Sequence, residues 1–235
     1  MRVAFVHGFT QTKESWDRVI DALGAAHQCT AIDAPGHGTN PDGRASLAEC
    51  GRQIATTAGK CALVGYSMGA RMALHAALAH PGQFTKIVLV SGTAGIDDPD
   101  ERHQRRLSDE NLADRIELIG VPAFIDEWLA NPMFAGLPAD PAQRAQRLAN
   151  TAKGLADSLR HAGTGTQEPL WERLASIDVP VLVVTGAEDE KFDALGRRMA
   201  SLIPHADHVS VHGAGHAVHA ERPDEFVDLL RRFLA

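Results

Sequence analysis

The stretch Gly65-Tyr66-Ser67-Met68-Gly69 lies between a short apolar run, Ala62-Leu63-Val64, and an alanine-rich segment, Ala70–Ala79. The apolar run is typical of a buried strand, and the segment after the motif is typical of a helix. Between two such elements, glycines allow a sharp turn from which the Ser67 hydroxyl projects, and the helix N-terminus supplies free N–H groups. The motif alone is weak, because a polar turn with a capping serine has the same sequence. Its position between strand and helix favours a nucleophilic serine.

Similar apolar runs alternate with helical segments along the chain. The expected strands are Arg2–Val6, Gln28–Asp33, Cys61–Tyr66, Lys86–Ser91, Pro180–Thr185 and His208–His212. The expected helices lie near Ser15–Leu23, Ser46–Ala58, Met68–His80, Asp189–Leu202 and Pro223–Leu234. Continuous apolar runs are typical of strands buried on both faces, so the alternation predicts a doubly wound α/β fold with a parallel sheet.

One region, from about Gly95 to Trp171, contains no convincing strand. It is rich in Ala, Leu, Arg and Asp, and prolines separate its helical patches. We therefore predict a core of residues 1–94 and 172–235, with a helical cap of residues 95–171 inserted before the last two strands.

The composition narrows the class of protein. With 30 acidic and 23 basic residues among 235, the chain has a formal charge of −7, which disfavours nucleic-acid binding. No apolar run approaches the ~20 residues that a membrane-spanning helix needs, and no signal-peptide pattern opens the sequence. Three cysteines without a Cys-x-x-Cys motif do not make a disulfide framework. We expect a cytoplasmic protein, a monomer or small homo-oligomer, that binds neither membranes nor nucleic acids.

A second motif, His7-Gly8-Phe9-Thr10, follows the first expected strand. A serine that attacks or polarises a carbonyl compound needs N–H donors for the oxyanion that develops. The loop after an early strand usually gives one donor, and the residue after the serine gives the other. The expected donors are the N–H groups of Phe9 and Met68, although His-Gly is also a common loop turn.

Acidic residues follow the fifth expected strand, in the stretch Thr185–Glu190. An acid at the carboxyl end of a strand can orient a histidine and stabilise its cation. Glu188, Asp189 and Glu190 are all candidates, and a solvated acidic turn is the alternative. The order Ser…Asp…His along the chain favours Asp189.

The histidine that completes this set is His216, in Gly213-Ala214-Gly215-His216 after the last expected strand. The glycines allow the loop to bring the imidazole over the sheet to Ser67. A zinc site with His219 is the alternative, but these histidines are three residues apart rather than four, and no third ligand stands at metal spacing. Four signals at strand ends predict nucleophile and general-base chemistry on a carbonyl-bearing substrate.

With these motifs the sequence resembles the α/β-hydrolase superfamily over its whole length, and Asp33–Gly38 is a further hallmark. The resemblance implies an α/β-hydrolase fold with about six or seven mostly parallel strands, because the two leading strands are missing or vestigial. A narrower resemblance, to the MenH family of menaquinone biosynthesis, rests on the motifs above. It also rests on Trp128 with Pro132 and Phe134, on Gly163-Thr164-Gly165 and on Asp189-Glu190-Lys191-Phe192.

The MenH resemblance implies a lyase on a hydrolase fold. Such a lyase eliminates pyruvate from 2-succinyl-5-enolpyruvyl-6-hydroxy-3-cyclohexene-1-carboxylate to give 2-succinyl-6-hydroxy-2,4-cyclohexadiene-1-carboxylate. Ser67, Asp189 and His216 then form a catalytic triad that acts as a base. The substrate-binding residues that the resemblance implies are His7, Tyr66, Arg71, Arg105, Trp128, Arg147, Lys191 and Phe192. Ala70 stands where the family usually has a second glycine, and this change removes no reacting group.

The arginines themselves favour an anionic substrate. Arg71 follows Ser67 by about one helical turn, and Arg102, Arg105 and Arg106 share part of one expected helix. Arginine binds carboxylates bidentately, but nearby acidic residues could pair with the last three side chains instead. The aromatic residues of the cap have the same two interpretations, because they either line the pocket or pack the cap: Trp128, Phe134 and Trp171.

Two other functions share this pattern. A carboxylesterase or C–C bond hydrolase would use the same triad with Ser67 acylated, and only the arginines and Lys191 argue against it. A non-catalytic scaffold often lacks a triad residue, whereas all three are present here. For the lyase we expect a small-molecule carboxylate substrate, no metal and no organic cofactor, because no glycine-rich phosphate loop is present.

Overall fold

The structure is a computed structural model that describes residues 1–235. Its centre is one sheet of six strands in the order β2-β1-β3-β4-β5-β6, and every pairing is parallel. The strands are β1 (Arg2–Val6), β2 (Gln28–Ile32), β3 (Cys61–Tyr66), β4 (Phe84–Val90), β5 (Val181–Gly186) and β6 (Ala206–Val211). This confirms the predicted fold class, with six strands.

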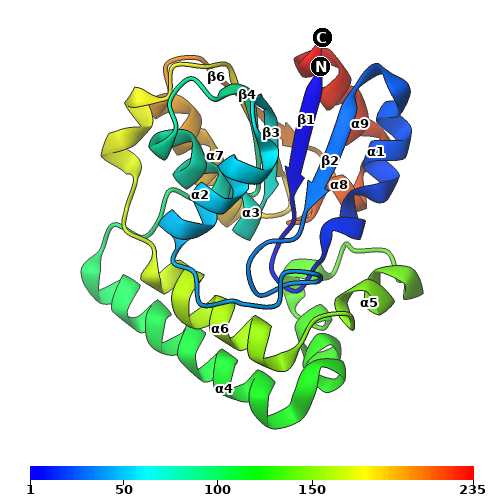
Figure 1. Cartoon of the computed structure of the whole chain (residues 1–235), viewed down its shortest axis with the longest axis vertical. Coiled ribbons are helices and arrows are strands. Elements are labelled where there is room, and N and C mark those ends of the chain that lie inside the picture. Colours follow the sequence, from blue (N-terminus) through cyan, green and yellow to red (C-terminus); the bar gives the residue numbers. More distant parts are fainter.

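Helices cover both faces of the sheet (Figure 1). Successive side chains of a strand point to opposite faces, so Val6 packs in one apolar cluster and Phe5 in the other. The first cluster includes residues of α2 (Leu47–Ala58), α3 (Met68–Ala79) and α7 (Glu190–Leu202). The second includes residues of α1 (Asp17–Leu23), α8 (Val218–Glu221) and α9 (Pro223–Leu234). Together the two clusters bury β3 completely, which explains its uninterrupted apolar run.

The segment between β4 and β5 forms a layer of helices at the carboxyl ends of the strands (Figure 1). Its helices are α4 (Pro99–Leu129), α5 (Pro141–Arg147) and α6 (Ala152–Ala162), with short 3-10 turns at Pro132–Phe134, Thr164–Thr166 and Trp171–Ser176. We refer to residues 95–171 as the cap. Its division from the core remains a prediction, although α4 and α6 share a small apolar cluster of their own.

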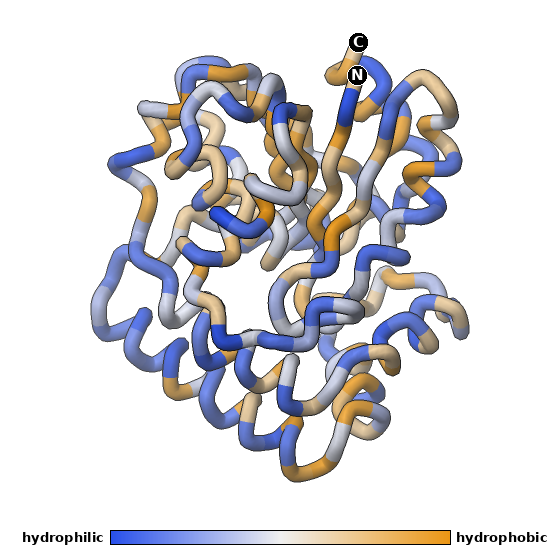
Figure 2. The backbone as a smooth tube through the Cα atoms, in the orientation of Figure 1, coloured by the Kyte–Doolittle hydropathy of each residue, from blue (hydrophilic) through white to orange (hydrophobic).

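The long helix α4 bends at Gly120, whose backbone angles of φ 76° and ψ 165° are not helical. Pro122 follows and lacks the N–H that would continue the helical hydrogen bonds. The turns before the bend are mostly hydrophilic (Figure 2), whereas the turns after it carry the buried Phe124 and Ile125. The bend therefore directs the second part of α4 toward the carboxyl ends of the strands.

The expected elements differ from the observed ones only at their ends. For example, β2 ends at Ile32 rather than Asp33. The Asp33 carboxylate instead accepts hydrogen bonds from the N–H groups of Lys13 and Thr39, which tie two loops together. None of the helices combines the length and apolar character needed to cross a membrane.

Candidate active site

Ser67 occupies a strained turn between β3 and α3. Its φ of 51° and ψ of −106° lie outside the regions that most residues adopt. The turn is possible because glycines flank it, since a Cβ on Gly69 would overlap the carbonyl oxygen of Val6. This geometry lifts the Ser67 side chain away from the sheet, as the strand–turn–helix pattern predicts.

Two hydrogen bonds join Ser67 to His216 and His216 to Asp189. The Ser67 Oγ lies 3.0 Å from His216 Nε2, and His216 Nδ1 lies 2.7 Å from Asp189 Oδ2. Because a carboxylate only accepts, Nδ1 carries the proton and Nε2 accepts from the Ser67 hydroxyl. His216 is 2% exposed. The three predicted residues therefore form a chain of hydrogen bonds that can move a proton from the serine to the imidazole.

The other acidic candidates do not take part in this chain. Glu188 and Glu190 are exposed, whereas the Asp189 carboxylate also accepts a hydrogen bond from the Phe192 N–H at 3.3 Å. The Phe192 ring packs edge-on against the His216 ring, with centroids 4.4 Å apart. Asp189 is thus the acid that the geometry selects.

Two N–H groups are available for an oxyanion beside Ser67. Met68 is the first residue of α3, where N–H groups lack an intrahelical acceptor. No hydrogen bond within the chain occupies the Phe9 N–H. The next residue, Thr10, has a φ of 66°, which is rare for a β-branched side chain. This strained backbone places the loop after β1 beside the elbow.

Thr10 is held by three contacts. Its N–H donates to His37 Nε2 at 3.3 Å, and its carbonyl oxygen accepts from the Asn150 amide at 2.7 Å. Its hydroxyl oxygen accepts from the Arg147 guanidinium. Because Asn150 and Arg147 belong to the cap, the cap fixes the loop that carries Phe9.

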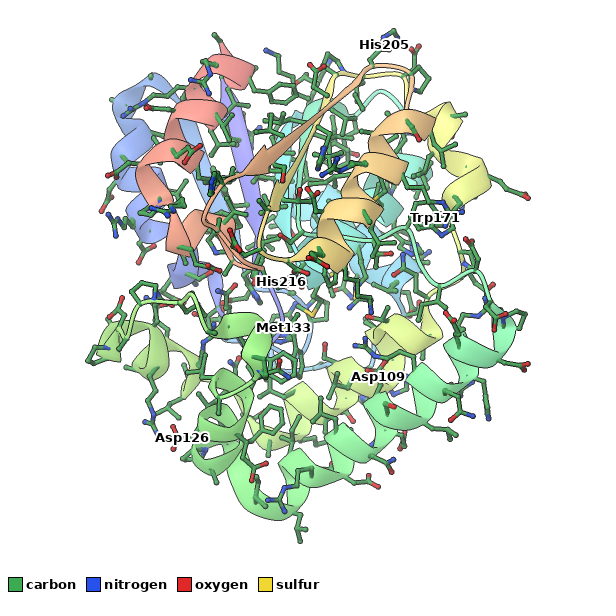
Figure 3. All side chains as sticks on the ribbon, turned by 180° about the vertical axis from the view of Figure 1, so that it is seen from behind. Asp109, Asp126, Met133, Trp171, His205 and His216 are labelled. Atoms are coloured by element: carbon green, nitrogen blue, oxygen red, sulfur yellow. The ribbon has the colours of Figure 1, made fainter.

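A cavity of about 740 Å³ opens between the sheet and the cap, with the triad in its wall. Figure 3 shows His216 of the core close to Met133 of the cap, and both residues line the cavity. The structure brings most of the predicted substrate-binding and oxyanion residues to the wall: Phe9, Tyr66, Met68, Arg71, Arg105, Trp128, Arg147, Lys191 and Phe192. Sequence reasoning missed other lining residues, among them Gln11, Thr93, Asn131, Met133, Ser158 and Thr164.

His7 is the one predicted substrate-binding residue that does not line the cavity. It is fully buried, and its Nε2 accepts the N–H of Ala34 at 3.1 Å. Burial lowers the pKa of His7 to about 4, so the ring is neutral. His7 therefore supports the loops behind the site, which corrects its expected place among the substrate-binding residues.

Two arginines of the wall are buried without a carboxylate partner. Arg71 is 7% exposed and donates to the carbonyl oxygen of Ala162 at 2.9 Å. Arg147 is 3% exposed, and its Nε has no partner. Burial lowers the pKa of each to about 10, so both remain charged at neutral pH. Neither guanidinium has a carboxylate within ion-pair distance, and Asp109 favours the charge of Arg71 only from farther away. Such weakly compensated buried charge is costly and points to an anionic ligand.

The arginines at the start of α4 are arranged differently. Arg105 lines the cavity, but its Nε lies 2.7 Å from the carboxylate of Asp109 and its side chain is 42% exposed. Arg102 donates to the carbonyl oxygen of Ile96 at 2.9 Å, and Arg106 is exposed. Only Arg105 of this group is placed to meet a bound ligand.

The aromatic residues of the cap divide into two sets. The Trp128 ring packs edge-on against Phe9 at 5.3 Å, and Phe134 lies 6.2 Å from the His216 ring, so both close the cavity over the triad. Trp171 lies elsewhere, because its ring stacks under the Arg198 guanidinium at 3.7 Å and its N–H donates to Gly95. Trp171 is thus a packing residue.

The Alpha/beta hydrolase family model matches residues 3–229. The chain belongs to the alpha/beta hydrolase family. Within this family, it is 37% identical over 99% of its length to a Bacillus subtilis (strain 168) protein, and it covers 89% of that protein. That relative carries the name "Putative 2-succinyl-6-hydroxy-2,4-cyclohexadiene-1-carboxylate synthase". A Salmonella typhimurium 2-succinyl-6-hydroxy-2,4-cyclohexadiene-1-carboxylate synthase is 32% identical over 99% of the chain and is covered to 93%.

A solved structure agrees with the sequence relatives. The structure of MenH from S. aureus superposes on the chain with a TM-score of 0.94 and 30% identity. The match covers 100% of this alpha/beta hydrolase and 93% of the S. aureus chain. The core and the helical cap are therefore both shared with that structure.

Proposed function

We propose that the chain is a carbon–oxygen lyase of menaquinone biosynthesis. It eliminates pyruvate from 2-succinyl-5-enolpyruvyl-6-hydroxy-3-cyclohexene-1-carboxylate to give 2-succinyl-6-hydroxy-2,4-cyclohexadiene-1-carboxylate. The names of the full-length relatives support this reaction. The structural observation that carries the proposal is the pair of buried arginines, Arg71 and Arg147, that face the triad cavity without a carboxylate of their own.

The chemistry of the substrate matches this wall. The molecule carries three carboxylates: one on the ring, one on the succinyl arm and one on the enolpyruvyl group. Arg71, Arg147, Arg105 and Lys191 line the same cavity as Ser67, and guanidinium groups bind carboxylates with two parallel hydrogen bonds. A neutral ester would leave Arg71 and Arg147 buried and unpaired, which disfavours a general esterase.

The triad acts as a base in this mechanism. His216, oriented by Asp189, takes the hydroxyl proton of Ser67, and the Ser67 oxygen removes the ring proton next to the succinyl ketone. The electrons of the C2–H bond first form an enolate, with the charge on the oxygen of the succinyl ketone. They then return to form the C2=C3 double bond, those of C3=C4 form C4=C5, and the C5–O bond breaks. The leaving oxygen carries its electron pair away as the enolate of pyruvate. His216 then releases the proton that it holds, and the enolate takes up one proton to give pyruvate.

The Phe9 and Met68 N–H groups stabilise the charge that develops on the ketone oxygen during this elimination. Such preorganised donors are worth about 3–4 kcal/mol each in other enzymes. The cap contributes through Thr10, whose contacts with Asn150 and Arg147 hold the Phe9 loop. Binding of a carboxylate by Arg147 and stabilisation of the enolate are thereby coupled.

The reaction needs no redox step and no group carrier, so we propose that it proceeds without a metal or an organic cofactor. The partner is the small-molecule carboxylate substrate. We also propose a cytoplasmic location, and a monomer or small homo-oligomer as the working form.

The experiment that tests the function measures pyruvate release from the substrate, generated in situ because it is unstable, beside turnover of a neutral nitrophenyl ester. We expect pyruvate release well above the spontaneous rate and poor ester turnover. Good ester turnover without accelerated pyruvate release would instead identify a serine carboxylesterase or C–C bond hydrolase that uses the same triad.

A further inference from the structure

We propose that Glu221 is a positioning residue that holds the backbone on both sides of His216. This proposal rests on the role of His216 as the base of the triad. The Glu221 carboxylate accepts the Gly215 N–H at 2.7 Å through Oε2 and the Ala217 N–H at 2.9 Å through Oε1. One carboxylate thus brackets the histidine by its two neighbouring peptide groups.

The loop that carries His216 needs hydrogen bonds of this kind to fix its backbone. It runs from the end of β6 at Val211 to the start of α8 at Val218, so neither sheet nor helix fixes its backbone. Buried or partly buried N–H groups require acceptors, and Glu221 supplies two of them. The Glu221 N–H also donates to the carbonyl oxygen of Ala217 at 2.9 Å, which closes the short helix α8 onto the same loop.

Glu221 has no cationic partner that would give it another role. No lysine, arginine or histidine lies within ion-pair distance of its carboxylate, whereas Arg222 beside it donates to the carbonyl oxygen of Gly213 at 3.0 Å. Glu221 does not line the cavity. It therefore acts on the reaction through the position of His216, not through contact with the substrate.

The cap also packs closely against the Glu221 carboxylate. A Cβ on Gly136 would overlap Glu221 Oε2, so a side chain at position 136 must displace it. The neighbouring Leu137 packs against the apolar cluster that contains Ala217 and Val218. The segment after the Pro132–Phe134 turn thus rests on the histidine loop, and Gly136 offers a second way to disturb the bracket without changing Glu221.

The variant E221Q isolates this function. Glutamine keeps the shape of the side chain but offers one acceptor oxygen, so its NH₂ group must face one of the two N–H donors. We expect kcat for pyruvate release to fall about 10-fold to 100-fold with KM unchanged, because small displacements of a catalytic group have effects of this size. G136A should also lower kcat. The control variant E225Q removes the charge of an exposed side chain four residues later and should leave kcat unchanged.

Labelling of Ser67 with a fluorophosphonate separates positioning from loss of folded protein, and it does not depend on the lyase reaction. Displacement of His216 slows the labelling of every molecule but leaves the final extent unchanged, whereas partial unfolding lowers the extent and leaves the rate unchanged. We expect E221Q to label about tenfold more slowly to the same extent. Parental labelling and parental kcat in E221Q would overturn the proposal. Slowed labelling in E221Q, without pyruvate release by the parent, would support Glu221 and reject the lyase.

Discussion

Two sides of the cavity differ in how their polar groups are satisfied. We call the side with Ser67, His216 and Asp189 the sheet side, and the side with Arg71 and Arg147 the arginine side. On the sheet side, Ser67, His216 and Asp189 are joined to one another by hydrogen bonds. On the other side, Arg71 and Arg147 are buried with only neutral oxygen atoms as partners. The polar side chains of the sheet side are paired without a ligand, whereas the guanidinium groups of the arginine side have no charged partner.

This difference separates the groups that serve the reaction from the groups that select the substrate. A satisfied triad with two free N–H groups can serve several reactions that begin at a carbonyl compound. Buried guanidinium groups cost several kcal/mol of solvation, and an anion that enters the cavity restores that interaction. In the proposed function, the sheet side provides the base, whereas the arginine side decides which substrate the base meets.

The largest effect is expected from the sheet side. In S67A the base is lost, so kcat for pyruvate release should fall by about 10³-fold or more. Affinity for the substrate should persist, because the arginines are intact. A stopped assay of pyruvate with enzyme in excess measures this, and a near-parental rate would refute a role for Ser67 as the base.

On the arginine side, R71M should lower kcat/KM by about 10²-fold to 10³-fold, the cost of leaving a buried carboxylate unpaired. The same change should leave the thermal unfolding midpoint unchanged or raise it, because it removes a buried charge that has no carboxylate within ion-pair distance. R106M is the matched control, since Arg106 is exposed and outside the cavity. A marked loss of stability in R71M would mean that Arg71 supports the fold rather than the ligand.

Thr10 connects the two sides of the cavity through its contact with Arg147, and a substitution can remove this contact. T10V removes the hydroxyl that accepts from Arg147 and keeps the branched shape of the side chain. We expect kcat to fall about tenfold, because the Phe9 loop loses a contact with the cap, and KM to rise because Arg147 becomes mobile. Steady-state kinetics with pyruvate detection would show both changes, and an effect on neither would separate the two sides.

Arg105 should matter least, because Asp109 already neutralises it and its side chain is partly exposed. We expect R105M to raise KM about threefold to tenfold with little change in kcat. An effect as large as that of R71M would place Arg105 among the residues that define the substrate.

Acidic pH should destabilise the folded chain, because buried histidines behind the sheet side are neutral. Burial lowers the pKa of His7 to about 4 and of His37 and His219 to about 3, from an ordinary value of 6.5. As the pH falls below 6.5, the unfolded chain therefore takes up a proton at each of these three rings that the folded chain does not yet bind. Together the three rings should lower the free energy of unfolding by up to about 4 kcal/mol per pH unit near pH 5.

H219F tests this pH dependence. Both ring nitrogens of His219 lack partners, and the ring packs 4.6 Å from Trp16 and 4.4 Å from Tyr66, so phenylalanine fits the same surroundings. The midpoint of acid unfolding, followed by circular dichroism, should move to lower pH in H219F. An unchanged midpoint would show that His219 is not among the groups whose protonation unfolds the chain.

Spacing and motifs alone predicted the triad better than the arginines of the cap, for a physical reason. Ser67, Asp189 and His216 each follow an apolar strand, and parallel strands bring their carboxyl ends to one edge. The cap has no strands, so the faces that its helices turn to the cavity depend on tertiary packing. Arg105 and Arg106 are neighbours in sequence, but only the first lines the cavity.

His7 illustrates a different limit. The family resemblance placed it among the substrate-binding residues, but the sequence does not show that Ala34 would supply a backbone donor for its ring. Gln11 and Met133 could not be singled out either, because no spacing or motif marks a side chain that only lines a wall.

The bend of α4 at Gly120 interrupts the helical hydrogen bonds of the cap, because none of them can reach the nitrogen of Pro122. Packing rejoins the two parts, since Ile116 before the bend and Phe124 after it lie in one apolar cluster with α6. Amide protons on the two sides of Gly120 should therefore exchange with solvent as one group. Trp128, which lies over the triad, then moves only when this shared cluster opens.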